Sequence, residues 1–272
     1  MLMNLYKYRN PDELTKKMIK NHEIFLSDPM SFNDPFDCKS NFFLFGDYTK
    51  WYNLYKNTGR SHIVADLSAK EYQNKNIEVD EAKRIEFENS HRICCFSKVN
   101  DSILMWSHYA KNHQGVCLIY NTSPYTHESI RSMKVEENQL NFEEQHFREN
   151  LILLPVKYRY KFPKAFNYFL VDEDPFGVAK YFYTKHKNWH YEKEYRIIVR
   201  DSHLKNNSNL ISLNKHALKG IIFGLRTSKE YIDEIQNLCL NEYIKLGYSF
   251  NLFKAVADKN KYQINIEKVH FN

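Results

Sequence analysis

Apolar and polar residues alternate in several short segments of the chain, and this period of two predicts β-strands. The segments with the strand pattern are Leu2–Tyr8, Glu23–Ser27, Arg92–Phe96, Val116–Tyr120, Pro155–Tyr160, Glu194–Arg200, Leu210–Leu213, Gly220–Phe223 and Val256–Ile266. They do not alternate regularly with helices, as the strands of a doubly wound sheet would. The pattern therefore favours an α+β fold with a mixed, mainly antiparallel sheet core.

A helical spacing of apolar residues predicts four shorter helices, which are Asn10–Ile19, Ser102–Lys111, Phe176–Trp189 and Lys229–Leu246. At the first of them, Asn10 is the expected cap and Pro11 the first helical residue. Two longer polar regions, near residues 42–90 and 128–154, carry charges at helical spacing and predict helical insertions. No low-complexity linker or internal repeat divides the chain. We therefore interpret residues 1–272 as a single α+β domain with these two insertions.

The composition is that of a globular protein, with 43% hydrophobic and 26% charged residues among 272. Twenty Tyr and nineteen Phe can wall a pocket for a planar, polar ligand, although an AT-rich genome is the larger cause of this excess. The net charge of +6 suits an anionic ligand such as a nucleotide or nucleic acid. The segment Lys157–Lys164 mixes basic and aromatic residues. It can bind a nucleic-acid strand, but such a pattern is more typical of a strand with one solvated face.

The five cysteines form no C-x-x-C pair, which makes a disulfide framework or a zinc ribbon improbable. The N-terminal segment lacks the apolar core of a signal peptide, and no apolar run is long enough to span a bilayer. We therefore expect a cytoplasmic protein with reduced thiols and no membrane partner.

Several common catalytic motifs are absent from the sequence. Only seven glycines occur, and none forms G-x-G-x-x-G or a P-loop, so a Rossmann or Walker-type phosphate cradle is not expected. No H-E-x-x-H, G-x-S-x-G, or H-x-E with C-x-x-C is present. These absences argue against zincins, α/β-hydrolases and zinc deaminases.

Two motifs near the N-terminus can carry chemistry. In the segment Tyr6–Arg9, strand alternation separates the two tyrosines from Lys7 and Arg9, and an arginine at a strand end can hold a phosphate. The segment Ser31–Cys38 combines turn-forming Asn33 and Asp34 with a second carboxylate at Asp37. These carboxylates can bind a metal or a ribose hydroxyl, or simply fix a turn.

Two further motifs lie later in the chain. Trp106 and Tyr109 are three residues apart on one helical face, next to His108, which can titrate near neutral pH. In the last motif, Glu192 and Glu194 straddle the start of a strand and should therefore share one face. Two carboxylates so close raise the pKa of one of them, which suits acid–base or oxocarbenium chemistry; alternatively, both are solvated and matched by Lys193 and Arg196.

These motifs resemble those of an uncharacterised bacterial family that is catalogued only as a domain of unknown function. The shared motifs are Y-K-Y-R, F-N-D-P-F-D-C, C-F-S followed by M-W-S-H-Y-A and H-x-G-V-C-L, W-x-Y-E-x-E-Y-R, and I-I-F-G. The resemblance spans most of the chain and implies no activity. It is consistent with a cytoplasmic protein in an anti-phage or toxin-like role.

The order of three residues is also similar to that of ADP-ribosyltransferases of the Arg-Ser-Glu type. This resemblance implies that Arg9 holds the diphosphate or ribose of NAD and that Ser97 supports its nicotinamide half. Glu194 would bind the ribose 2′-hydroxyl and stabilise an oxocarbenium-like transition state. Glu192 would orient or deprotonate the acceptor.

The remaining polar and aromatic members of the motifs would then bind NAD as a substrate, with Tyr8 or Tyr109 stacked on nicotinamide. These cofactor-binding candidates are Tyr8, Asn33, Asp34, Trp106, His108 and Tyr109. The resemblance implies no metal ion. The acceptor would be a protein, a nucleic acid or water.

Two other functions remain open at this point. The first is a metal-dependent nuclease, in which Asp34, Asp37, Glu192 and Glu194 would converge on Mg²⁺ beside a nucleic-acid platform at Tyr158–Lys164. The second is a non-catalytic nucleotide-sensing module, in which the glutamate pair would be structural. Dependence on Mg²⁺ would favour the nuclease, and ligand binding without turnover would favour the sensor.

Overall fold

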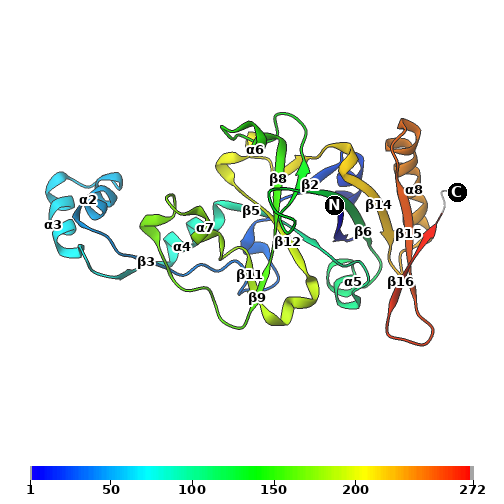
Figure 1. Cartoon of the computed structure of the whole chain (residues 1–272), viewed down its shortest axis with the longest axis horizontal. Helices are drawn as coiled ribbons and strands as arrows, with labels where there is room; N and C mark the ends of the chain where they lie inside the picture. Colours follow the sequence, from blue (N-terminus) through cyan, green and yellow to red (C-terminus); the bar gives the residue numbers. More distant parts are fainter. Residues whose placement is uncertain (1, 270–272) are drawn as a thin grey trace.

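The computed structural model describes residues 2–269 and shows a mixed α and β protein built on one large sheet (Figure 1). The nine strands of this sheet are, in spatial order, β1 (Met3–Arg9), β5 (His91–Ser97), β12 (Glu194–Arg200), β8 (Asn150–Pro155), β7 (Arg131–Lys134), β6 (Val116–Pro124), β14 (Leu218–Phe223), β15 (Asn251–Ala257) and β16 (Ile264–Val269). Because β1 also pairs with β6, the first six strands close into a barrel and the last three extend from β6. Only β14 and β15 pair in parallel in this sheet, so the prediction of a mainly antiparallel α+β core is confirmed.

Three small sheets and eight α-helices complete the described part of the chain. The small sheets pair β2 (Glu23–Phe25) with β13 (Leu210–Ser212), β3 (Phe42–Leu44) with β4 (Ile77–Glu78) and β10 (Phe166–Asn167), and β9 (Lys157–Arg159) with β11 (Thr184–His186). The helices are α1 (Glu13–Lys20), α2 (Tyr48–Asn57), α3 (His62–Tyr72), α4 (Glu81–Asn89), α5 (Ile103–Tyr109), α6 (Gln145–Glu149), α7 (Pro175–Ala179) and α8 (Lys229–Glu242). Helices α2 and α3 lie at one end of the long axis, and α8 with β15 and β16 lies at the other (Figure 1).

The first helix begins two residues later than expected. Asp12, not Asn10, is the cap, and its side chain accepts a hydrogen bond from the Thr15 amide at 2.8 Å. Asn10 contributes its backbone carbonyl instead, which accepts from the Thr15 hydroxyl at 2.8 Å. The cap therefore holds the chain directly after Arg9, the last residue of β1.

The helices predicted near residues 42–90 are present as α2, α3 and α4. The short strands β3 and β4 pair with each other on either side of α2 and α3. Trp51 of α2 is buried beside Phe169, with ring centroids 5.2 Å apart, so this region packs on a second apolar cluster rather than standing free.

Two helix predictions are wrong. The region near 128–154 contains β7 and β8, with only the five-residue α6 between them. Its charges suggested a helix, but Leu151 and Leu153 alternate into the core, and pairing with β7 fixes the strand. The segment 176–189 contains the end of α7, the strand β11 and part of a 3₁₀-helix at Lys187–Glu192.

The main core combines side chains of all six barrel strands with those of the two helices α1 and α8. Leu5, Leu118 and Ile221 of neighbouring strands are fully buried there. A third apolar cluster lies under α5, where Tyr8 packs edge-on against Trp106 with ring centroids 5.1 Å apart. All five cysteines are free thiols. Among residues 2–269, no helix is both long enough and apolar enough to cross a membrane.

Candidate functional site

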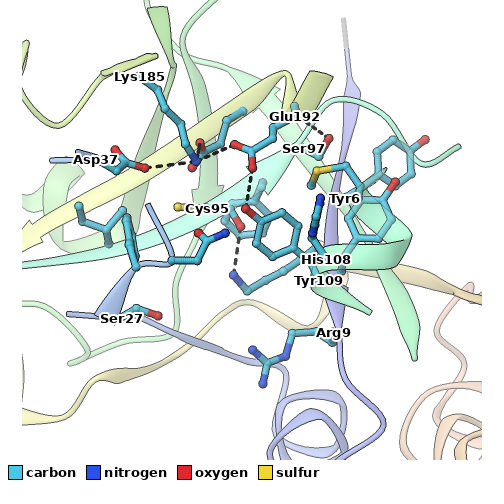
Figure 2. Close-up of a pocket in the computed structure, with 18 of the residues that line it drawn as sticks. Tyr6, Arg9, Ser27, Asp37, Cys95, Ser97, His108, Tyr109, Lys185 and Glu192 are labelled. Atoms are coloured by element: carbon cyan, nitrogen blue, oxygen red, sulfur yellow. Dashed lines mark hydrogen bonds and ion pairs between the residues drawn. The ribbon is translucent and has the colours of Figure 1, made fainter. Parts of the chain in front are cut away.

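One cavity of about 400 Å³ collects residues from all four motifs (Figure 2). Eight of the residues predicted from the sequence line it: Tyr8, Arg9, Asn33, Ser97, His108, Tyr109, Glu192 and Glu194. The volume lies within the range of about 300–1,000 Å³ that is usual for small-molecule sites. Residues far apart in the sequence thus form one concave surface with several polar groups.

The register of three neighbouring strands positions one side of the cavity. Ser97, the last residue of β5, lies opposite Tyr6 of β1 and opposite Glu194 of β12. Arg9 is three residues further along β1, which corresponds to about 10 Å of extended chain. Figure 2 accordingly shows Arg9 at the opposite end of the cavity from Glu192 and Lys185.

A buried arginine holds two of the carboxylates at the other end. Arg196 is fully buried and donates from Nε and Nη2 to the two carboxylate oxygens of Glu194, at 2.8 and 3.0 Å. It also donates to both oxygens of Asp37, at 2.8 and 2.6 Å. A backbone carbonyl, that of Phe182, accepts a further hydrogen bond at 2.7 Å. Such fork-shaped pairing fixes carboxylates in position as well as in charge.

Lys185 of β11 joins the third carboxylate to this group. Its Nζ lies 2.7 Å from Glu192, 3.2 Å from Asp37 and 3.5 Å from Glu194. Three carboxylates thus face two cations, and one negative charge is in excess when all five groups are ionised. Figure 2 shows Lys185, Asp37 and Glu192 converging at one end of the cavity.

The two glutamates have pKa values that shift in opposite directions. Burial alone would raise the pKa of Glu194, but Arg196 and Lys185 outweigh it and lower the pKa to about 2. Burial raises the pKa of Glu192, and the attraction of Lys185 offsets this only in part. The pKa of Asp37 is lowered because Arg196 outweighs its burial. One carboxylate therefore stays ionised while its neighbour takes up a proton more readily, a division typical of acid–base sites.

Three hydroxyl groups orient the two glutamates. The Tyr109 hydroxyl donates to the Glu192 carboxylate at 2.6 Å, and the Ser97 hydroxyl donates to the Glu192 backbone carbonyl at 2.6 Å. The Glu194 amide donates to the Tyr158 hydroxyl at 2.8 Å. Ser97 is only 1% exposed, so in this structure its hydroxyl holds the backbone of Glu192.

Glu192 and Glu194 lie close together, as predicted, but not because strand alternation puts them on one face. Glu192 is the last residue of a 3₁₀-helix, and Glu194 is the first residue of β12. Between them, Lys193 adopts a left-handed conformation with φ of 44°, so the pair does not lie on one continuous strand. Nor are the carboxylates solvated, because Glu192 is 2% and Glu194 5% exposed.

Sequence reasoning missed two cations of this site. Lys185 carries no recognisable motif, and it joins the glutamates only because β11 pairs with β9 beside them. Arg196 is visible in E-Y-R, but the sequence pattern indicates a partner for solvated carboxylates rather than a core residue. Asp37 pairs with this arginine. The signal that could have found Arg196 is its place two residues after Glu194 on one strand face.

Two predicted cofactor-binding residues do not line the cavity. Trp106 is fully buried behind Tyr8, and its indole NH donates to the Asn100 carbonyl at 2.8 Å. The Asp34 carboxylate accepts from the Phe36 amide at 2.9 Å and so fixes the turn that presents Asp37. Both residues support the site from outside it.

The geometry provides no set of metal ligands for the alternative function, a metal-dependent nuclease. Among the residues described, 2–269, no group of three or more His, Cys, Asp and Glu is arranged to hold a metal ion. Asp37 and Glu194 share the guanidinium of Arg196 instead, and Asp34 is part of the adjacent turn. The cluster is arranged as an ion-pair network.

Comparison with known proteins gives a match to a family model over part of the chain and no activity. A family model described as a protein of unknown function (DUF2971) matches residues 105–197. The matched range includes Tyr109, Lys185 and the two glutamates but neither Arg9 nor Ser97. The predicted resemblance to a domain of unknown function is therefore confirmed over this range. No curated protein and no solved structure matches the chain.

Proposed function

We propose that this chain is an ADP-ribosyltransferase-like enzyme that breaks the nicotinamide–ribose bond of NAD and transfers ADP-ribose to a macromolecule or to water. One observation carries the proposal: Arg9, Ser97 and Glu194, from three separate motifs, lie on three adjacent strands around one cavity. The separated pKa values of the glutamates agree with it. The proposal includes NAD as the substrate and assigns no metal ion.

The two ends of the cavity suit the two ends of NAD. Arg9 keeps 19% of its side chain exposed, and its nearest carboxylate, that of Asp12, is 3.9 Å away. Its Nε donates to the Thr15 hydroxyl at 3.3 Å, which orients the guanidinium and leaves the terminal nitrogens for a diphosphate. At the other end, Tyr109 and His108 present rings beside the acidic cluster, where the cationic nicotinamide ring would stack.

The acidic cluster suits the chemistry of glycosidic bond cleavage. When the C1′–N bond breaks, its electron pair leaves with neutral nicotinamide, and positive charge develops on the ribose. Glu194 remains ionised because its pKa is about 2, and it therefore stabilises this charge without first losing a proton. The acceptor then bonds to C1′ and gives up its proton. Glu192, whose pKa is raised, is placed to receive that proton.

A non-catalytic nucleotide sensor is the second candidate, and one observation favours it. Every oxygen of the Glu192 and Glu194 carboxylates already has a partner within the protein. A carboxylate oxygen can accept two hydrogen bonds, so this pairing leaves room for a ribose hydroxyl. In a sensor, the same network would only shape the pocket.

The decisive experiment measures nicotinamide release from labelled NAD by the purified protein. Wild type is compared with Glu194→Gln, Arg9→Gln and the matched surface variant Glu267→Gln, whose side chain is exposed on β16. We expect turnover by wild type and Glu267→Gln, a loss of at least about 100-fold in Glu194→Gln, and a raised KM in Arg9→Gln. Thermal denaturation of each variant separates loss of chemistry from loss of fold.

Each of the other outcomes has a defined meaning. Calorimetric binding of NAD without nicotinamide release would identify the sensor. Neither binding nor release, with varied acceptors present, would refute both candidates. Equal turnover by wild type and a folded Glu194→Gln variant would remove Glu194 from the mechanism.

NAD chemistry would also suit a toxin or anti-phage effector, because loss of NAD or modification of a macromolecule stops growth. Expression in a bacterial host tests this role. We expect wild type to arrest growth and Glu194→Gln, expressed at an equal level, to leave growth unchanged. Equal growth in both cultures would argue against a toxic role.

A further inference from the structure

A second concave surface lies next to the proposed active site and displays aromatic rings to solvent. We call it the aromatic–basic surface. It consists of residues 157–164 together with Phe36 and His186. Residues 159–163 of this segment line a hollow of about 310 Å³ with Phe36, His186, Lys39 and Lys185. Three of its rings are exposed, with Tyr160 at 77%, Phe162 at 59% and Phe36 at 65%. Large exposed rings gathered at one hollow indicate a binding surface.

The rings form two contacting pairs around this hollow. The Phe36 and Phe162 ring centroids are 6.2 Å apart, and those of Tyr160 and His186 are 5.9 Å apart, in an edge-on arrangement. These contacts hold the rings in place while leaving most of the Tyr160 and Phe162 surface free. Such rings are suited to stack against a flat, uncharged group.

Four basic side chains belong to the same segment as the rings of Tyr160 and Phe162, and two of them, Arg159 and Lys161, line the hollow. Lys157, Arg159, Lys161 and Lys164 are all exposed, and no acidic residue interrupts the segment. Within residues 2–269, none of these four side chains makes an ion pair, in contrast to Lys39, which lies 3.6 Å from the buried Glu88. Their charge is therefore available for an anionic ligand.

The surface is connected directly to the acidic cluster. Lys185 lines both the hollow and the cavity, and it contacts Glu192 at 2.7 Å. On β9, Tyr158 points inward to the Glu194 amide, whereas its neighbour Arg159 is exposed and pairs with His186 of β11. One short segment thus supports the glutamates on its inner side and presents rings and positive charge on its outer side.

We infer that the aromatic–basic surface binds a single-stranded nucleic acid and delivers one of its nucleotides to Glu192 as the acceptor of ADP-ribose. Bases of a single strand are free to stack on exposed rings, while the phosphates match the four free cations. A duplex keeps its bases stacked and would use only the charges. This inference names the acceptor class and so rests on the proposed function, but the binding step can be tested without NAD.

The first test measures fluorescence anisotropy of labelled oligo-dT and oligo-rU, without NAD, against the purified protein. We expect binding of a single strand to be weakened about tenfold or more by Tyr160→Ala or Phe162→Ala. Tyr262→Ala is the matched control, because Tyr262 is a fully exposed tyrosine beyond the C-terminal end of β15, outside both pockets. Comparison of the two oligonucleotides distinguishes DNA from RNA, and duplex DNA of the same length should bind more weakly.

The second test examines the charges through the salt dependence of binding. In the double variant Arg159→Gln, Lys161→Gln, the slope of log affinity against log salt should become shallower by about 1.4, or about 0.7 for each phosphate that is no longer neutralised. The matched double variant Lys259→Gln, Lys261→Gln removes two exposed lysines of the β15–β16 connection and should leave the slope unchanged. Equal effects of the two double variants would overturn the inference.

The third test adds labelled NAD and asks where the label goes. The acceptor role is supported if wild type labels the single strand and Tyr160→Ala does not. Tyr160→Ala should still release nicotinamide with water as the acceptor. NAD turnover with no affinity for any single strand, or label only on protein, overturns the inference and leaves the proposed function standing. Affinity for the single strand without NAD turnover refutes the proposed function and the acceptor role, but retains the binding surface.

Discussion

The hydroxyl of Ser97 donates a hydrogen bond to the backbone carbonyl of Glu192, at 2.6 Å. The Ser97 hydroxyl oxygen also accepts from the Val99 amide at 3.1 Å, so Ser97 connects the end of β5 to Glu192, two residues before the start of β12. Since Ser97 also lies opposite Glu194 in the strand ladder, it positions both glutamates at once. Its contribution in this structure is to hold the backbone that carries the acidic pair.

Ser97→Ala should therefore destabilise the protein as well as the site. The substitution leaves the buried carbonyl of Glu192 and the partly buried amide of Val99 without their partner, which costs about 1–3 kcal/mol of unfolding free energy. Urea denaturation measures this loss. Ser202→Ala, an exposed serine, is the control and should change stability by less than about 0.5 kcal/mol. If both variants unfold alike, Ser97 does not hold the Glu192 backbone.

Arg196→Met should be among the most destabilising single substitutions in the chain. It leaves Asp37 and Glu194 as buried charges without their main partner, and breaking a buried pair in this way costs about 3–5 kcal/mol. Arg200→Met on the same strand is the matched control, because Arg200 pairs at 3.2 Å with Asp172, which is 86% exposed. A surface pair contributes about 1 kcal/mol or less, so chemical denaturation should rank the two variants clearly.

The lowered pKa of Glu194 predicts how stability changes with pH. Its folded-state pKa of about 2 lies below the ordinary value of 4.5, so its contribution is present above pH 4.5 and is lost as the pH falls towards 2. The whole contribution is about 3 kcal/mol, at about 1.4 kcal/mol for each pKa unit. Asp37 acts in the same direction, and Glu192, with its raised pKa, acts in the opposite one.

Urea denaturation at a series of pH values checks this prediction. Between about pH 6 and about pH 3, wild type should lose stability more steeply than Glu194→Gln, because the variant has no proton to take up at that position. The exposed variant Glu267→Gln should follow the wild-type curve. Parallel curves for wild type and Glu194→Gln would mean that Glu194 is not held ionised by Arg196.

Local pattern was sufficient to predict the strands that form the site. β1, β5 and β12 are short runs with turn residues or caps at their ends, so their boundaries are visible in the sequence. The motifs at the ends of these strands line one cavity because the ends of neighbouring strands lie side by side. The resemblance to ADP-ribosyltransferases, and not the strand pattern, grouped Arg9, Ser97 and Glu194; the strand ladder and the cavity bring them together.

Some strands and the roles of two cations of the site could not be predicted, because they depend on pairing between segments that are far apart in the sequence. β7 and β8 lie in a charge-rich segment whose pattern predicts a helix. Their pairing with each other and with β6 and β12, together with the burial of Leu151 and Leu153, makes them strands. Lys185 similarly lies in a segment with a helical pattern. Its role depends on the parallel pairing of β11 with β9, which no local pattern shows. The buried ion pairs of the site could not be predicted for the same reason.

Gly115→Ala should separate the binding role of Arg9 from the chemistry at Glu194. A Cβ at Gly115 would lie 2.0 Å from the backbone carbonyl of Arg9, so the end of β1 must move to accommodate it. Glu194 lies on β12, which β5 separates from β1, and at the level of Tyr6 rather than Arg9, so the acidic cluster should keep its geometry. We expect the KM for NAD to rise about tenfold or more while kcat changes little.

The control for this prediction is another glycine with the same kind of backbone contact. A Cβ at Gly220 would lie 2.3 Å from the carbonyl of Asn251, between β14 and β15 and outside the lining of the cavity. Gly220→Ala should therefore destabilise the protein without raising the KM. An increase in KM of equal size in both variants would show that general loosening of the sheet, rather than displacement of Arg9, weakens the binding of NAD.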